Sequence, residues 1–301
     1  FALGGDSILG FRLLSRARAR GVSFGFRDMF ERRTVAALAE VCSAYEPAAA
    51  SGRITLPVSA EEAERLTAEP GVADVLPLSP NQQGLLFHHA FDDTEADPYT
   101  LQVVLDFAAP VDAARLGAAL DRVLGRHEAL RAGFRTTEDQ RSVQLVHEAP
   151  GVPVREVSVA DDAGFAALLD EDRATRFDLT RPPLVRAAAV RRADGTGSVV
   201  LTLHHIIVDG WSLPIVAREL FAEYGAPGAV REEAGRARYR DHLAWLDGTD
   251  PEASLSVWRA ALAEVTEPSR VAAGQGARVL EPVRQEHLLS EEETAALAAV
   301  A

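Results

Sequence analysis

Apolar residues recur at helical spacing close to the start of the chain. They lie at Ile8, Phe11, Leu14 and Ala17. Residues three or four positions apart share one helix face, so this pattern predicts an amphipathic helix from Ser7 to about Gly21. Shorter helices are predicted at 26–30 and 34–41. Residues 1–45 are therefore expected to form a small helical piece.

The hydrophobic pattern stops after residue 45. Proline, alanine, serine and glycine fill the next stretch, which is typical of a linker between domains. A capping box that starts at Ser59 then predicts a helix, which Pro70 and Gly71 should end. We expect residues 46–73 to be a linker and a linker helix.

From residue 74 onward, strand patterns alternate with helical ones. Strands are predicted at 99–107, 143–147, 154–157, 184–190, 198–204 and 278–287, and helices at 82–89, 111–126, 163–176 and 212–224, with a further helix ending near 265 and a last one after Ser290. A turn at Gly195 predicts that two of these strands form a hairpin. The alternation indicates an α/β fold in which one mixed sheet is buried between helices.

Two adjacent histidines end one of the predicted strands. His204 and His205 follow an apolar run, and Asp209-Gly210 comes next, before the helix that starts at Ser212. Neighbouring strand residues point to opposite faces, so one histidine can enter a cleft while the other packs inside. An imidazole, a carboxylate and a glycine beside a helix N-terminus predict an active site.

Histidine also occurs in proteins for reasons other than catalysis. A buried histidine is often only a hydrogen-bonded core residue. A metal site is disfavoured, because the adjacent histidines diverge and no further cysteine or histidine cluster has ligand spacing. A second pair, His88-His89, lacks the Asp-Gly that follows His205 and is predicted to lie on a helix surface or in packing. We expect no metal at the site.

Composition narrows the possible partners. The chain has 301 residues, 47% of them hydrophobic and 25% charged, as in ordinary soluble globular proteins. A net charge of -14 argues against nucleic acid, because phosphate contacts need clustered lysine and arginine. The single cysteine, Cys42, cannot form an internal disulfide, and no apolar stretch is long enough to span a membrane. With no signal peptide, we expect a cytoplasmic protein cut from a longer chain, with a protein or small-molecule partner.

Ser7 stands at the start of the first helix, behind two glycines that permit a sharp turn. The helix dipole there favours an attached phosphate, although a plain capping serine explains the same pattern. Gly4 to Ile8 and the helices after it resemble the second half of a peptidyl carrier domain of nonribosomal peptide synthetases. The resemblance implies that Ser7 carries 4′-phosphopantetheine, added by a phosphopantetheinyl transferase. The family's first helix would precede Phe1, so we expect this piece not to fold as a complete carrier.

Four later segments together resemble a nonribosomal peptide synthetase condensation domain. They are Leu76-Pro77-Leu78-Ser79-Pro80-x-Gln82-x-Gly84, Arg126-His127-Glu128-x-Leu130-Arg131, His204-His205-x-x-x-Asp209-Gly210-Trp211-Ser212 and Tyr239-Arg240-Asp241-x-x-x-Trp245. The resemblance covers residues 74–301. It implies a chloramphenicol acetyltransferase-like first lobe and the start of a second, with a tunnel between lobes that two pantetheine arms enter from opposite ends.

The resemblance implies an amide-forming acyltransferase, in which the amine of an acceptor aminoacyl thioester attacks a donor thioester carbonyl. His205 would face the tunnel, as a general base or as a group that positions the amine. The reference pKa of an α-amino group, about 7.7–8.0, leaves both roles open. The backbone N–H of Gly210, next to a helix start, is a candidate donor to the oxyanion.

Other residues of the same motifs are expected to be structural parts of the active site. They are His204, Asp209, Arg131, Trp211 and Ser212. A further strand is predicted to begin near Arg131 and to run through Phe134. We expect Asp209 to pair with Arg131 on this strand, because a buried carboxylate favours a bidentate guanidinium partner.

The order of the two pieces predicts partner domains. A carrier that precedes the condensation domain on the same chain would be the donor, so an adenylation domain is expected upstream and an acceptor carrier downstream. The product would be a nonribosomal peptide, such as an antibiotic or a siderophore.

Three alternatives belong to the same fold. An epimerisation domain shares the first-lobe pattern, and Gly-Gly-Asp-Ser in the carrier favours it, whereas Trp211-Ser212 and Gln83-Gly84-Leu85 favour condensation. A heterocyclisation domain is disfavoured, because that group replaces the histidines with aspartate. An inactive platform that recruits partner proteins usually disrupts the histidine pair, which is intact here.

Overall fold

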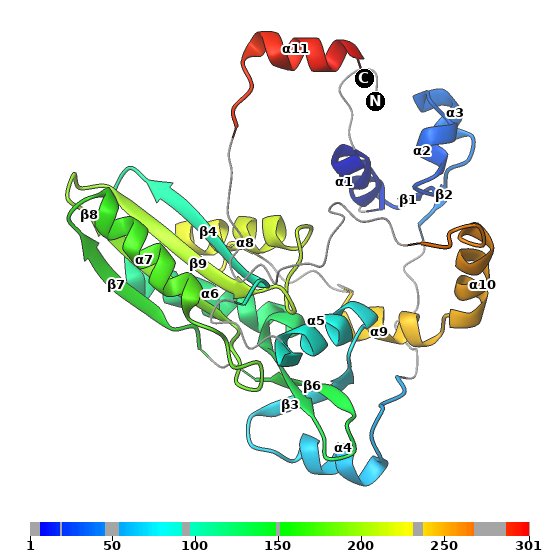
Figure 1. Ribbon diagram of the computed structural model, residues 1–301, viewed down its shortest axis with the longest axis horizontal. Coiled ribbons are helices and arrows are strands. Elements are labelled where there is room, and N and C mark those ends of the chain that lie inside the picture. The colour runs from blue at the N-terminus through cyan, green and yellow to red at the C-terminus, as the bar shows by residue number, and fades with distance from the viewer. Residues whose placement is uncertain are drawn as a thin grey trace. The chain divides into compact units, whose positions relative to one another are not determined.

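The computed structural model describes residues 7–18, 20–45, 54–91, 97–148, 151–230, 237–267 and 287–300. The chain divides into two compact units, Phe1–Ser51 and Gly52–Ala301, each of which is described by itself (Figure 1). The division falls within the stretch that the sequence assigns to a linker. Among the described helices, none is both long and apolar enough to cross a membrane.

The first unit contains short helices and a two-stranded ladder. Its elements are α1 (Ser7–Arg18), β1 (Val22–Ser23), α2 (Asp28–Glu31), α3 (Val35–Ala39) and β2 (Ser43–Ala44). The Thr34 hydroxyl accepts a hydrogen bond from the Ala37 N–H at 3.2 Å, which fixes the start of α3. The predicted helices are present, whereas the pairing of β1 with β2 was not predicted, because two-residue strands have no measurable periodicity.

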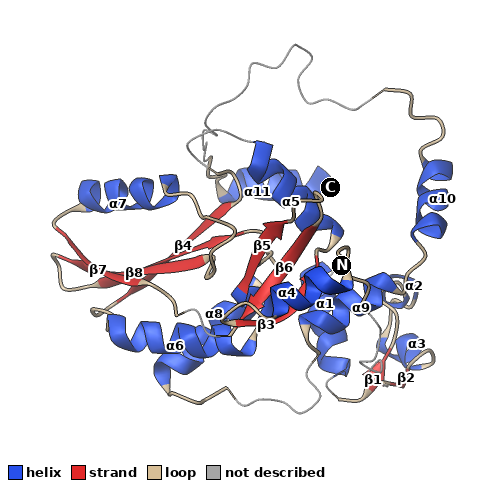
Figure 2. Cartoon of the chain, turned by 90° about the horizontal axis from the view of Figure 1, so that it is seen from below, coloured by secondary structure: helices blue, strands red, loops and turns tan. Residues whose placement is uncertain are grey.

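In the described part of the second unit, the strands form two separate sheets (Figure 2). The larger one has the order β4 (Thr100–Phe107), β9 (Gly197–His204), β8 (Val185–Arg192) and β7 (Val154–Val159), antiparallel except between β7 and β8. The smaller one has the order β3 (Val72–Pro77), β6 (Ser142–His147) and β5 (Ala132–Thr136). The prediction of one buried sheet was wrong, because periodicity shows which residues are buried but not which strand pairs with which.

Helices cover both faces of the larger sheet, which gives the expected α/β architecture. The remaining elements are α4 (Ala60–Thr67), α5 (Pro80–Phe91), α6 (Ala113–Arg126), the 3-10 helix η1 (Glu128–Arg131), α7 (Asp162–Ala174), α8 (Leu213–Gly225), α9 (Tyr239–Asp247), α10 (Pro251–Ala261) and α11 (Glu291–Val300). Side chains of α6 and α8 pack on one face of the sheet, and Leu168 of α7 packs on the other. The strand predicted at 278–287 falls almost wholly outside the described residues.

Strand β9 lies inside the larger sheet, and all eight of its residues are buried. Val199, Leu201 and Leu203 belong to the core cluster that contains α6, while Val200 packs with α7. The same alternation directs His204 away from the α6 side, in phase with Val200. Because the strand ends at His204, His205 enters a turn instead of continuing the ladder.

Candidate functional site

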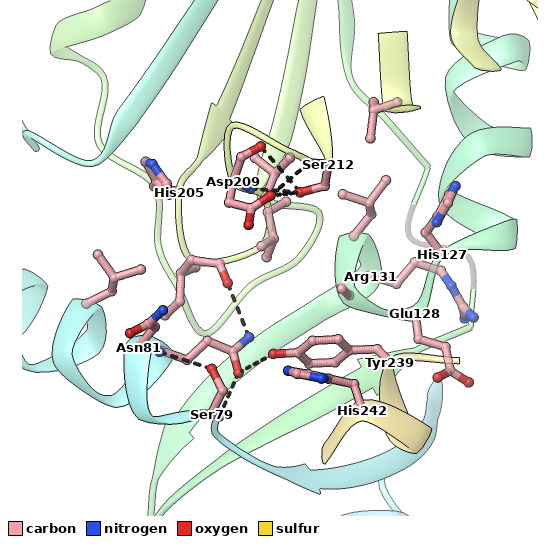
Figure 3. A pocket seen from close by; sticks show the side chains of 18 of the residues that line it. Ser79, Asn81, His127, Glu128, Arg131, His205, Asp209, Ser212, Tyr239 and His242 are labelled. Atoms are coloured by element: carbon pink, nitrogen blue, oxygen red, sulfur yellow. Dashed lines mark hydrogen bonds between the residues drawn. The ribbon is translucent and has the colours of Figure 1, made fainter. Parts of the chain in front are cut away.

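A pocket of about 1280 Å³ opens where β9 ends. Its walls come from the start of α5, from η1, from the turn between β9 and α8, and from α9. Figure 3 shows polar side chains from these separate elements around one cavity, among them Ser79, Glu128, His205, Asp209 and Tyr239.

The turn that carries the two histidines is anchored by the apolar residues behind it. Ile206, Ile207 and Val208 are 3%, 5% and 4% exposed and belong to the main hydrophobic core. Burying three such side chains stabilises the turn by several kcal/mol, at about 1.5–3 kcal/mol each. The apolar spacer between His205 and Asp209 therefore fixes the turn to the body of the domain.

His204 is fully buried and contacts a carboxylate that the sequence did not reveal. Its Nδ1 accepts a hydrogen bond from the Ile206 N–H at 3.1 Å, and its Nε2 lies 3.2 Å from Oδ2 of Asp97. Since Nδ1 is an acceptor, Nε2 carries the proton and donates it to Asp97. Asp97 also accepts from His89 Nδ1 at 2.6 Å and from the Tyr99 N–H at 2.9 Å.

Burial alone would raise the pKa of Asp97, but its hydrogen bonds from His204, His89 and the Tyr99 N–H outweigh that effect. The pKa of Asp97 is held far below its ordinary value. The carboxylate is therefore ionised, and it acts as the buried anchor of the first histidine.

Among the described residues, His89, Asp97 and His204 form one group with possible metal ligands, all within 4.8 Å of one another. The hydrogen bonds argue that this group is not a metal site. Nε2 of His204 bears a proton and has no lone pair to offer, because its Nδ1 already accepts from a backbone N–H. The Arg176 guanidinium lies 4.0 Å from the Asp97 carboxylate. Its positive charge balances this carboxylate and disfavours a metal cation beside it.

His205, in contrast, lines the pocket and is half-buried. Its backbone N–H donates to the Tyr99 carbonyl at 2.8 Å, which joins the turn to the start of β4. The two histidines therefore diverge, with His204 in the packing and His205 at the cavity. An imidazole in this position can accept a proton from a bound amine or orient it.

Asp209 closes its own turn. Its carboxylate accepts from the Ser212 hydroxyl, from the Ser212 N–H at 2.8 Å and from the Trp211 N–H at 3.1 Å. Burial opposes the charged form, but the hydrogen bonds from Ser212 and Trp211 outweigh it and lower the pKa of Asp209. Asp209 and Ser212 both line the pocket, at the beginning of α8.

Gly210 and Trp211 are not among the residues that line the pocket. Trp211 is 53% exposed, and Gly210 is exposed as well. The bonds of Asp209 use the N–H groups of Trp211 and Ser212, while the Gly210 N–H has no hydrogen-bond partner among the described residues. That N–H is consequently available to a ligand.

The predicted pair between Arg131 and Asp209 is not formed in the structure. Arg131 is the last residue of η1, not part of a strand, and its guanidinium donates to the carbonyl oxygens of His147 and Glu148. Asp209 accepts from groups in its own turn. Both side chains line the pocket, but each has nearer partners, so the expected pairing was wrong.

Two other residues of the same motif, Arg126 and His127, connect the end of α6 to α8. Arg126 donates to Glu223 at 3.0 Å and to Glu219 at 3.2 Å, and His127 Nε2 lies 2.9 Å from Glu219. Glu223 is fully buried and Glu219 is 4% exposed. These contacts hold α8 against the end of α6. They also hold the turn that precedes α8 in place.

Gln82 and Tyr239 belong to the sequence motifs, but the motifs alone assign no role to either residue. Gln82 is 5% exposed and lines the pocket, and the Tyr239 hydroxyl donates to its Oε1 at 3.0 Å. Burial and the Asp209 carboxylate raise the pKa of Tyr239, against a hydrogen bond from Ser79, so the hydroxyl keeps its proton. The sequence signal for Gln82 was its position in the first turn of a helix that begins at Pro80. A buried amide at such a place needs hydrogen-bond partners, which predicts contacts with other elements.

In the first unit, Ser7 is the first residue of α1. A hydroxyl-bearing residue at the positive end of a twelve-residue helix fits the attachment of a phosphate ester.

Comparison with known proteins identifies the family. Residues 72–299 match the family described as condensation domain, and residues 1–42 match the phosphopantetheine attachment site. The chain belongs to the condensation domain family, and its beginning is a phosphopantetheine attachment site. The family and the fold class expected from the motifs are thus confirmed.

Individual relatives agree with this assignment. AMB antimetabolite synthetase AmbE of Pseudomonas aeruginosa is 34% identical over 266 residues, which are 81% of this chain and 12% of that synthetase. The first condensation domain of the CDA synthetase has a TM-score of 0.58 at 22% identity, covering 70% of this chain and 53% of that one. The X-domain in complex with OxyB from teicoplanin biosynthesis has a TM-score of 0.59 at 26% identity, covering 78% and 50%. The chain thus spans about half of these structures and a small part of the synthetase.

Proposed function

We propose that this chain forms peptide bonds as part of a longer nonribosomal peptide synthetase. The donor acyl group is carried on Ser7, and the acceptor aminoacyl group is carried on a separate, downstream carrier. The observation that carries the proposal is the separation of the two histidines: His204 is fully buried on Asp97, whereas His205 lines a pocket of about 1280 Å³.

The phosphopantetheine group, when bound to Ser7, supplies a thioester on an arm that can move between sites. The first unit supplies the attachment point at the N-terminus of α1. A phosphopantetheinyl transferase adds the arm, and an upstream adenylation domain loads it. The net charge of -14 argues against nucleic acid as a partner.

The residues around the pocket can assist the reaction in separate ways. The amine nitrogen of the acceptor bonds to the donor carbonyl carbon, the carbon–sulfur bond breaks, and a proton leaves the amine. His205 orients the amine or accepts that proton. As the oxyanion donor of this proposal, the Gly210 N–H meets the carbonyl oxygen from the exposed side of the turn, because Gly210 itself does not line the pocket. Asp209 and Ser212 keep the turn in shape.

The intact synthetase that carries this chain provides the test. Ser7 is loaded with a labelled aminoacyl-pantetheine, the acceptor carrier is supplied with its own aminoacyl group, and mass and chirality are followed on both carriers. A dipeptidyl group on the acceptor, lost in Ser7→Ala but retained in Ser43→Ala, supports condensation. Ser43 lies exposed in β2 of the same unit and serves as the matched control.

Two results would contradict the proposal. If the mass on Ser7 stays constant while its aminoacyl group changes chirality, the domain is an epimerase. If neither carrier changes although both are loaded, the fold acts as a platform without catalysis.

A further inference from the structure

The side chain of Gln82 connects the histidine turn to three other parts of the domain. Its Nε2 donates to the carbonyl oxygen of Ile206 at 3.2 Å. Its Oε1 accepts from the Ser79 N–H at 3.0 Å, from Gln144 Nε2 at 3.2 Å and from the Tyr239 hydroxyl at 3.0 Å. Figure 3 labels two of these partners, Ser79 and Tyr239, at the pocket.

The direction of this amide is determined by its partners. A flipped carboxamide would place its NH2 group against the Ser79 N–H and its oxygen against the Ile206 carbonyl. Both contacts would set like groups against each other in a buried place. The donor of Gln82 therefore faces the histidine turn, and its acceptor faces α9 and β6.

Ile206 directly follows His205 in the chain. A hydrogen bond to the Ile206 carbonyl therefore restrains the backbone next to His205 and, with it, the position of the imidazole. The backbone is also bonded on the other side, from the His205 N–H to the Tyr99 carbonyl at 2.8 Å and from the Ile206 N–H to His204 Nδ1 at 3.1 Å. Gln82 supplies the bond from α5. Through the Tyr239 hydroxyl, the same amide reaches α9, which forms another wall of the pocket.

We propose that Gln82 is a positioning residue, which fixes His205 at the pocket and couples its placement to Tyr239 on α9. This inference rests on the proposed function only where its effect is measured as the rate of peptide-bond formation. Gln82 acts through the Ile206 carbonyl and takes no part in proton transfer.

The decisive variant is Gln82→Glu in the intact synthetase. A carboxylate keeps the acceptor oxygens for Ser79, Gln144 and Tyr239, but it has no donor for the Ile206 carbonyl. Displacement of His205 should lower kcat by about 10–100-fold, with KM changed by less than about threefold, because misplacing a reacting group by 1 Å can cost about 100-fold. The matched control is Gln83→Glu, which makes the same change at an exposed neighbour that does not line the pocket.

A second measurement does not depend on peptide-bond formation. Diethylpyrocarbonate modifies accessible imidazoles, and peptide mapping gives the rate at His205 relative to the exposed His287. Release of the turn in Gln82→Glu should raise this relative rate by about threefold or more, as local opening exposes a half-buried ring. If the native synthetase makes no peptide bond while this rate still rises, the proposed function fails and the positioning role stands.

Unchanged kcat together with an unchanged modification rate in folded Gln82→Glu would overturn the inference. Should Gln82→Glu fail to fold, Tyr239→Phe removes a single oxygen from the same junction. A modification rate at His205 that rises in Tyr239→Phe supports the coupling, and a rate equal to that of the native protein refutes it.

Discussion

Nε2 of His204 and Oδ2 of Asp97 lie 3.2 Å apart, although the two residues are 107 positions apart in sequence. Both side chains are buried. Asp97 also accepts from the Tyr99 N–H, and the Tyr99 carbonyl in turn accepts from the His205 N–H. One carboxylate therefore places the first histidine directly and the second through the backbone.

Replacing Asp97 by asparagine should destabilise the second unit at pH 7. The change removes the negative charge that His204 and His89 face, and hydrogen bonds to charged groups contribute about 1.5–3 kcal/mol each. We expect a loss of about 2–4 kcal/mol in the free energy of unfolding, measured by urea denaturation followed by circular dichroism. Asp139→Asn, at an exposed position, is the control and should leave the midpoint unchanged.

The same variant predicts a pH dependence. The pKa of Asp97 is lowered in the folded state, so its contribution is complete above the ordinary value of 3.8 and is lost as pH falls below it. The difference in unfolding free energy between the native protein and Asp97→Asn should stay constant from pH 7 to about pH 5 and shrink below about pH 4. A difference that instead shrinks between pH 7 and pH 6 would locate the titrating group elsewhere.

Removal of the His205 imidazole tests its role in the reaction. If the ring transfers a proton, His205→Ala should lower single-turnover transfer to the acceptor carrier by about 10²–10⁴-fold. A ring that only positions the amine should lower the rate without removing its dependence on pH. Because the ring is half-buried at the pocket, the variant should keep the native circular dichroism spectrum. Native turnover in the folded variant would exclude both roles.

The structure predicts that Arg131 and Asp209 act independently. A double-mutant cycle with Arg131→Met and Asp209→Asn, measured by urea unfolding, should give a coupling free energy within about 0.5 kcal/mol of zero, since the two side chains share no contact. A coupling free energy above about 1 kcal/mol would instead indicate that the ion pair expected from the sequence is formed. Arg126→Met with Glu223→Gln, a pair joined at 3.0 Å, is the positive control.

The free N–H of Gly210 can be tested by comparing two substitutions. Gly210→Pro deletes the N–H, whereas Gly210→Ala retains it, and a Cβ at this position would meet nothing within 4 Å. We expect transfer in Gly210→Pro to be slower than in Gly210→Ala by about 10²–10³-fold, the usual effect of removing one oxyanion donor. Equal rates in two folded variants would show that this N–H does not contact the reacting carbonyl.

The local sequence was sufficient for much of the secondary structure. The sequence predicted that His204 and His205 would diverge as successive strand residues. They do diverge, but β9 ends at His204, and His205 lies in the turn that follows. The capping box at Ser59 predicted α4, and apolar periodicity predicted α6 and α7. The structure adds Asp112 and Asp161 as the N-caps of α6 and α7. These features depend on residues within a few positions of one another.

The tertiary structure decided which groups meet. Nothing near His204 in sequence indicates Asp97, and nothing near Ile206 indicates Gln82, since each partner comes from a distant element. Arg131 and Asp209 carry complementary charges, yet each is satisfied by closer groups once the chain is folded. The sequence by itself therefore determined the family and many of the longer helices and strands. The division of the strands into two sheets and the partners of each buried polar group depended on long-range packing, which periodicity does not encode.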